Sequence, residues 1–237
     1  MLKTFIQVPP VILLLVIALG GCTSVPLPIQ TNAARDIPTS AEPGERVSLM
    51  IRSFVITKQT GGGEPEETAA APEKEKLELQ QCLVEELQQP RDDMIPIVAQ
   101  PVTPVPGPMK AIASAGPAAD LKIVVAAIPV LQSGTRYAVM VDAAHLLSDP
   151  KVVVLPLVVL GYFRNTRFEA FELKATIYDL GAGSSAGTAR AASGGTTGTT
   201  AGYWGYAAAG LEHNYLDRAR VCRELAIKIR EFLAGKE

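Results

Sequence analysis

The chain has 237 residues, with 22 basic and 24 acidic side chains and a formal net charge of −2. This nearly balanced charge excludes a strongly basic protein that binds nucleic acid by neutralising phosphates, so we expect no nucleic-acid partner. The length suits one domain or two small ones. With 2 His and 3 Cys there is little material for a metal cluster, and we expect no metal and no other cofactor.

The N-terminus has the pattern of a secretory signal peptide. Lys3 supplies a positive start, and an unbroken apolar run follows over residues 11–19. This run is well short of the roughly 20 apolar residues that cross a bilayer as a helix. We therefore predict a cleaved signal peptide over residues 1–21, in preference to an N-terminal membrane anchor.

The run ends in Leu19-Gly20-Gly21-Cys22, which resembles the lipobox of bacterial lipoproteins. Small residues before the Cys let the backbone fit the signal peptidase, and the thiol forms a thioether to diacylglycerol. The resemblance implies that Cys22 is the lipid attachment residue, that it becomes the first residue, and that it carries acyl chains such as palmitate. In that family an Asp after the Cys favours retention at the inner membrane. Thr23 therefore implies anchoring in the outer membrane, facing the periplasm, with inner-membrane anchoring as the alternative.

The rest of the chain divides into a lipidated tether and one folded domain. Residues 22–45 carry four prolines and no helical or alternating period, which is typical of a flexible tether. Residues 46–237 are predicted to form a single α+β periplasmic domain. We expect mobile loops in this domain near 58–72, 100–119 and 181–203.

Two amphipathic helices are predicted, over residues 73–89 and 213–233. Each carries a Cys on its apolar face, Cys82 on the first and Cys222 on the second. In an oxidising periplasm these two residues form a candidate disulfide if the helices lie side by side. The alternative is two buried free thiols that pack as small hydrophobes.

The strand signals favour one sheet. Residues 168–180 alternate between apolar and polar side chains, a Gly-rich turn follows at 181–185, and 186–192 can pair back as a hairpin. The apolar run 152–163, which contains Pro156, is predicted to be one strand buried on both faces and bent at the proline. Further strand patterns cover 46–56 and 121–131, with a weaker one over 137–141. The predicted fold class is α+β, with one small mixed, largely antiparallel sheet and both helices packed on one face.

This order of elements, with Phe171-Glu172-Leu173-Lys174-Ala175-Thr176-Ile177-Tyr178-Asp179-Leu180-Gly181 leading into the turn, resembles a known envelope fold. It is similar to the small α+β domain of the curli-secretion lipoprotein, of penicillin-binding-protein-activator lipoproteins and of the N-terminal domain of the Tol–Pal translocation protein. In those proteins the penultimate strand often ends in an Asp followed by a Gly-containing turn. The resemblance implies a protein that acts by contact with other envelope proteins, and it allows an oligomeric ring.

Two catalytic patterns fall on the same turn. Gly183-Ser184-Ser185-Ala186-Gly187 matches the G-x-S-x-G nucleophile elbow, and His213 follows later in the chain. Residues 181–186 also fit the G-x-G-x-x-A dinucleotide pattern. Both patterns need a helix directly after the loop, and Gly and Thr dominate here, so a hairpin turn is the favoured interpretation.

We therefore expect a non-enzymatic, lipid-anchored cell-envelope protein. It would act by protein–protein contact in envelope assembly, secretion or cell-wall maintenance. Its partners would be the membrane, through the lipid on Cys22, an envelope protein, and further copies of itself. One alternative is a lipid-anchored serine hydrolase that uses Ser185 and His213, and another is an oligomeric ring or pore component.

Overall fold

The computed structural model describes residues 22–59, 67–91, 96–102, 135–156, 160–204 and 207–236. The predicted signal peptide and the first three lipobox residues lie outside the described residues. So do the strand predicted over 121–131 and most of the proline-rich stretch after residue 102.

Two helices and ten strands make up the described chain. The helices are α2 (Glu73–Gln88) and α5 (Arg218–Leu233). The strands are β1 (Cys22–Pro26), β2 (Ile29–Arg35), β3 (Glu45–Gln59), β4 (Glu67–Ala70), β5 (Ile97–Pro101), β6 (Thr135–Ser148), β7 (Lys151–Pro156), β8 (Leu160–Asp179), β9 (Ser184–Trp204) and β10 (Ala207–Tyr215).

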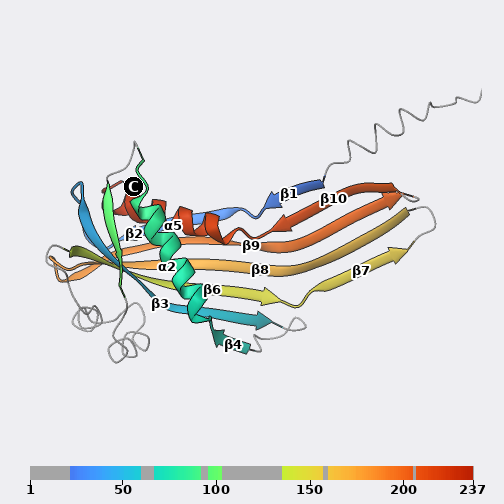
Figure 1. Cartoon of the computed structure of the whole chain (residues 1–237), viewed down its shortest axis with the longest axis horizontal. Coiled ribbons are helices and arrows are strands. Elements are labelled where there is room, and N and C mark those ends of the chain that lie inside the picture. The colour runs from blue at the N-terminus through green and yellow to red at the C-terminus, as the bar shows by residue number, and fades with distance from the viewer. Residues whose placement is uncertain are drawn as a thin grey trace, which may run out of the picture.

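The strands form one mixed sheet of ten strands, in the order β1-β10-β9-β8-β6-β3-β4, with β2, β5 and β7 paired off this path. Its centre is the hairpin of β8 and β9, which have 20 and 21 residues and are paired along their whole length. At about 3.3 Å per residue each of these strands is roughly 65 Å long. Figure 1 shows them running from one end of the molecule to the other.

The two ends of this hairpin have different neighbours. Near the β8–β9 turn, β6 pairs with residues 169–179 of β8 and β2 pairs with residues 187–193 of β9. At the other end β7 pairs with residues 161–166 of β8, and β10 pairs with residues 198–204 of β9. We call this second part, β7, β10 and the segments paired with them, the projecting sheet, because it extends beyond the helices (Figure 1). We call the first part the base.

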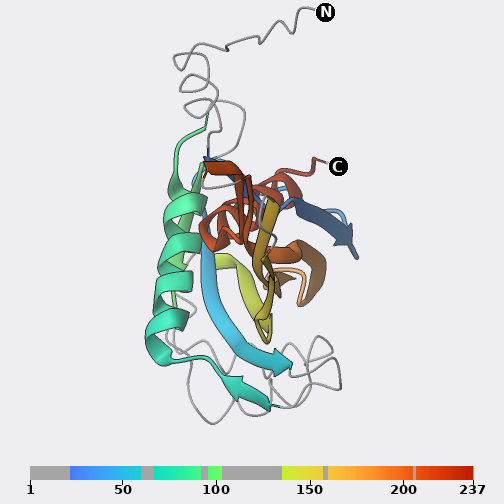
Figure 2. The ribbon, with the colours of Figure 1, turned by 90° about the vertical axis from the view of Figure 1, so that its right-hand side faces the viewer.

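The helices cover the base of the sheet. α2 lies along one side of a strongly twisted sheet, as Figure 2 shows from the end of the projecting sheet. The buried core joins the helices to β3, β6, β8 and β9. Its helical members are Leu79, Leu83, Leu87, Val221, Cys222, Leu225, Ala226, Ile229, Phe232 and Leu233. The projecting sheet contributes no residue to this core cluster in the part of the chain that is described.

The start of α5 differs from the prediction. We expect a helix from residue 213, but residues 213–215 belong to β10 and the helix begins at Arg218. Asp217 is the N-cap, because its Oδ1 accepts a hydrogen bond from the backbone N–H of Arg220 at 3.0 Å. Hydrogen bonds between β10 and β9 keep the chain extended as far as Asn214, so the helix cannot begin earlier.

The predicted fold class was wrong. The structure is mostly sheet, and the sheet is a large one of ten strands that the two helices cover only at its base. The error came from residues that carry strand structure without an alternating apolar pattern. Residues 193–202, interpreted as a mobile Gly/Thr-rich stretch, continue β9, and the Thr residues there suit a strand paired on both sides.

Two other segments also differ from expectation. The tether predicted over residues 22–45 contains β1 and β2, which pair with β10 and β9. The apolar run 152–163 is divided between β7 and the start of β8, which pair antiparallel. It is not a doubly buried strand, because the side chains of residues 152–155 are all exposed.

Candidate functional site

A polar cleft of about 530 Å³ lies where the helices end and the projecting sheet begins. Its floor comes from alternate residues of three neighbouring strands, since residues two apart on a strand share a face. The register places these strands together, because Asn165 pairs with Thr199 and Thr199 pairs with His213. The floor side chains are Asn165, Arg167, Glu169, Thr197, Thr199, His213 and Tyr215.

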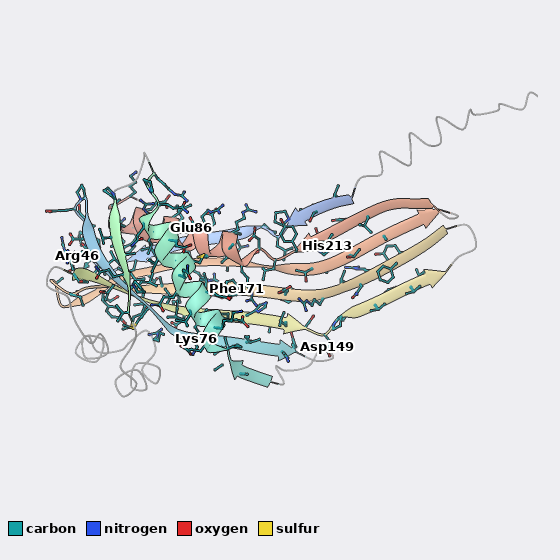
Figure 3. All side chains as sticks on the ribbon, in the orientation of Figure 1. Arg46, Lys76, Glu86, Asp149, Phe171 and His213 are labelled. Atoms are coloured by element: carbon teal, nitrogen blue, oxygen red, sulfur yellow. A yellow bond between two sulfur atoms is a disulfide. The ribbon has the colours of Figure 1, made fainter. Side chains whose placement is uncertain are left out.

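Figure 3 shows where the cleft lies relative to the core. Phe171, on β8, lies beside α2, whereas His213, on β10, lies beyond the ends of the helices. His213 is exposed, and its ring stacks on that of Tyr215 with centroids 6.2 Å apart and an angle of 11° between the planes. Its Nδ1 is 3.2 Å from Oγ1 of Thr199. The cleft therefore presents two stacked rings beside hydroxyl and amide groups.

A buried histidine lies behind the cleft, in contact with Glu169 of its floor. Nε2 of His145, on β6, is 2.8 Å from Oε1 of Glu169, and its Nδ1 is 2.6 Å from Nη2 of Arg218. A guanidinium group only donates, so Nδ1 must be the acceptor and Nε2 must carry the proton donated to Glu169. Arg218 also donates to Oε2 of Glu75, on α2, at 2.9 Å.

The network continues on the cleft side of Glu169. Its Oε2 accepts hydrogen bonds from Thr197 at 3.2 Å and from Arg167 at 3.3 Å. The chain of contacts thus runs from α2 through α5 and β6 to β8 and β9. These contacts hold the helices to the sheet at the edge of the cleft.

The His145 environment also sets its charge state. Burial is the largest effect and lowers the pKa of His145, and the positive charge of Arg218 lowers it further, while Glu169 opposes both. The ring edge faces Phe171 at 5.8 Å, and the guanidinium of Arg218 lies over the same phenyl ring at 5.4 Å. With both nitrogens engaged, His145 has no free position from which to transfer a proton to a ligand in the cleft.

The structure does not bring Ser185 and His213 together. Ser185 lies near the turn end of β9 and donates a hydrogen bond to Oδ2 of Asp36 at 3.0 Å. His213 contacts Thr199, fourteen residues further along the same strand. This separation is about 46 Å along β9. The two residues of the predicted hydrolase therefore lie far apart on the sheet.

The Gly-rich motif is the turn between β8 and β9. Asp179 ends β8, and its Oδ1 accepts hydrogen bonds from the backbone N–H groups of Gly181 at 2.9 Å and Ala182 at 3.0 Å. Gly183 has a φ of +68°, which favours glycine. A strand follows directly. The segment thus lacks the helix that a nucleophile elbow or a dinucleotide site requires.

Cys82 and Cys222 lie together between the two helices. They form a disulfide with an S–S distance of 2.09 Å and a Cα–Cα distance of 6.5 Å, and 140 residues separate them in sequence. One turn further along α2, Glu86 accepts a hydrogen bond from Arg223 of α5 at 3.1 Å. α2 and α5 are therefore joined covalently as well as by ion pairs.

Cys22, the candidate lipid attachment residue, begins β1 and pairs with Leu211 of β10. It thus lies beside the projecting sheet and not at the end of a long linker. Neither α2 nor α5, the helices of the described ranges, has the length and apolarity needed to cross a membrane. The same ranges hold no group of three or more His, Cys, Asp or Glu side chains suited to a metal ion.

The sequence singled out none of the residues that build the cleft except His213. His145 and His213 stand far apart in sequence, and Glu169, Thr197 and Arg218 are isolated polar residues in it. His145 and Glu169 are 24 positions apart in sequence, and the pairing of β6 and β8 brings them together. No motif spacing marks such a site, so only the strand register reveals it.

No family model and no curated protein matches the chain. Among solved structures, the chain is similar to a PelC dodecamer from Paraburkholderia phytofirmans, with 8% identity and a TM-score of 0.32, over 89% of this chain and 98% of that one. It is also similar to the hypothetical protein CT253 from Chlamydia trachomatis, with 9% identity and a TM-score of 0.33, over 65% of this chain and 71% of that one. Neither is a curli-secretion or penicillin-binding-protein-activator lipoprotein, and that resemblance stays a prediction. TM-scores this low assign no function to the chain.

Proposed function

We propose that the protein is a non-enzymatic lipoprotein of the cell envelope, anchored by acyl chains on Cys22 in the outer membrane and facing the periplasm. It acts by contact with another envelope protein, in envelope assembly, secretion or cell-wall maintenance. The lipobox pattern over residues 19–22 supports the anchor. The polar cleft supports the contact, and it is the observation on which the proposal rests.

The cleft is built for recognition and not for proton transfer. Both nitrogens of His145 and both oxygens of Glu169 are held in hydrogen bonds with neighbouring side chains. The groups that remain turned to the opening are the exposed amide of Asn165, the exposed ring of His213 and the half-exposed guanidinium of Arg167. Fixed donors and acceptors around a stacked ring pair suit an extended polypeptide segment, whose backbone offers one donor and one acceptor per residue.

Photo-crosslinking in living cells tests this contact. A benzophenone amino acid replaces Asn165, which lies on the cleft floor, and in a matched control replaces Lys74 of α2, whose side chain is 87% exposed. We expect a discrete crosslinked product from position 165 and none from position 74. Products of the same size from both positions, or from neither, would contradict a partner in the cleft.

The anchor is tested separately. We expect metabolic labelling with palmitate to mark the wild-type protein and to leave Cys22→Ala unmarked. The wild type should sediment with the outer membrane. An unmarked wild-type protein would overturn the anchor and leave the cleft result unaffected.

A second candidate function, a homo-oligomeric assembly, is favoured by the open edges of the sheet. In the described chain β4 and β7 each pair with one neighbour, so one edge of each backbone is open for pairing. Native mass measurement after mild detergent extraction tests this. A series of multiples of the protomer mass would support the assembly, and a single protomer mass at all concentrations would exclude it.

A further inference from the structure

The exposed apolar side chains gather on the projecting sheet. Of the eight large hydrophobic residues that are exposed in the described chain, four are Val152–Leu155 on β7, and a fifth is Val25 on β1, which pairs with β10. The β7 residues are 43–59% exposed. Successive residues of a strand face opposite sides, so β7 exposes apolar side chains on both faces of the projecting sheet. Contiguous apolar surface of this kind marks a site of interaction.

The hairpin formed by β7 and the start of β8 carries positive charge only. Residues 151–168 contain Lys151, Arg164 and Arg167 and no Asp or Glu. Lys151 pairs with Thr166 and Val153 pairs with Arg164, so Lys151, Val153 and Arg164 share one face. Apolar side chains bordered by cations suit a surface that is apolar inside and negatively charged outside. An anionic lipid surface has this character.

The lipid attachment residue lies on the same part of the fold. Cys22 pairs with Leu211, four residues from Ala207, where β10 begins beside the end of β9. Cys22 is thus about 13 Å along the strand direction from the far end of the sheet. That far end also carries the backbone of Trp204, the single Trp of the chain, at the last position of β9. Acyl chains on Cys22 would begin beside this end.

We propose that the far end of the projecting sheet docks on an anionic phospholipid surface, the one that holds the acyl chains of Cys22. This inference rests on the proposed lipid anchor and adds a second contact with the membrane. The apolar residues of β7 enter the interfacial region, and Lys151 and Arg164 pair with lipid phosphates. The cleft lies where the projecting sheet meets the base, away from this far end, and stays open to a partner protein.

Fluorescence of Trp204 tests the docking directly. The full protein, purified as the cell makes it, is reconstituted in vesicles of three parts phosphatidylethanolamine to one part phosphatidylglycerol that contain brominated acyl chains. We expect quenching of Trp204. In a matched control, Trp204→Phe with Lys74→Trp on α2, we expect no quenching, since α2 covers the base.

A charge variant gives the second measurement. Each basic residue near an anionic surface is worth about 1 kcal/mol, or about 5-fold, so Lys151→Gln with Arg164→Gln should lower the docking equilibrium about 30-fold. The control Lys74→Gln with Lys76→Gln should leave quenching unchanged. Lys151, Arg164 and Lys74 are exposed, and Lys76 is half-exposed beside Glu73 on the outer side of α2's first turn.

The outcomes separate this inference from the anchor. A protein that carries palmitate but shows unquenched Trp204 overturns the docking and leaves the anchor standing. Unquenched Trp204 together with multiples of the protomer mass would assign the apolar β7 surface to a second copy of the chain instead. A protein without palmitate overturns the anchor, and quenching in the same vesicles would then still support docking.

Discussion

Arg218 of α5 donates a hydrogen bond to Nδ1 of His145 on β6 across 2.6 Å, and its charge adds to the effect of burial in lowering the pKa of that imidazole. The contact joins the first turn of a helix to a strand 73 residues earlier in the chain. A proton on Nδ1 would remove the hydrogen bond from Arg218 and leave two cations that repel each other. The junction between helices and sheet is therefore sensitive to the charge of one ring.

Acidification should destabilise the fold through His145. Its pKa in the folded protein lies below the ordinary value of 6.5, whereas the unfolded chain takes the ordinary value. Below about pH 6.5 the unfolded chain therefore binds more protons, and the free energy of unfolding falls as pH decreases. His145 makes its full contribution to the free energy of unfolding above about pH 6.5. As the pH falls below that value, this contribution decreases by at most about 1.4 kcal/mol per pH unit. Urea unfolding between about pH 7 and pH 5 measures it.

The matched variant for this prediction is His145→Gln. A glutamine can donate to Glu169 and accept from Arg218 without titrating. We expect His145→Gln to show a shallower decline over the same pH range. An identical decline in both proteins would assign the pH dependence to other groups.

Loss of the disulfide should weaken the fold substantially. Cys82 and Cys222 close a long loop between α2 and α5. Replacing both with Ala should lower the free energy of unfolding by about 2–5 kcal/mol, because the unfolded chain gains freedom. Urea unfolding with and without a reductant measures this. The reductant should weaken the wild type and leave the double variant unchanged, and equal stability of the two oxidised proteins would contradict the prediction.

Gly198 should be hard to replace where the projecting sheet begins. Its φ is +126°, and a Cβ there would overlap the carbonyl oxygen of Asn165 and lie 2.9 Å from Cα of Thr166. We expect Gly198→Ala to cost about 2 kcal/mol or more, because both the backbone and the pairing with β8 are strained.

Gly202, four residues along the same strand, is the control. A Cβ at Gly202 meets no atom within 4 Å. Gly202→Ala should therefore change the free energy of unfolding by no more than about 0.5 kcal/mol. Thermal unfolding of the two variants side by side measures the difference, and equal losses would show that the strain at Gly198 is relieved elsewhere.

A fluorophosphonate probe should not react with Ser185. The hydroxyl donates to Asp36, and His213 is about 46 Å away along β9. With a carboxylate and no imidazole as its hydrogen-bond partner, the serine keeps the low nucleophilicity of an ordinary hydroxyl. Gel fluorescence of the labelled protein should match that of Ser185→Ala. Labelling that disappears in Ser185→Ala would restore the hydrolase hypothesis.

Local sequence patterns predicted the elements whose side chains pack on the core. The apolar period over residues 73–89 corresponds to α2, and the alternation over residues 168–180 corresponds to the base half of β8. Both signals arise because one face of the helix or strand is buried and the other is exposed to solvent. The Gly-rich turn after Asp179 was also evident, since it lies between two strands.

The projecting sheet left no such signal. Its described side chains are exposed or half-buried on both faces, so alternation of apolar and polar residues is not required there. Residues 193–204 are rich in Gly and Thr, and they become a strand only because β8 and β10 complete their hydrogen bonds on either side. The cleft follows from that same long-range register, which explains why Glu169 and Arg218 could not be linked to His145 beforehand.

The parallel pairing of β1 with β10 has a mechanical consequence. Five successive residues from Cys22 to Pro26 lie in register with β10, with Cys22 outermost. A pull applied at Cys22 along the strand would load those rungs together in shear and not open them one after another. Tension from an anchored end would thus pass into β10 and β9, and along β9 to the disulfide-linked body of the protein.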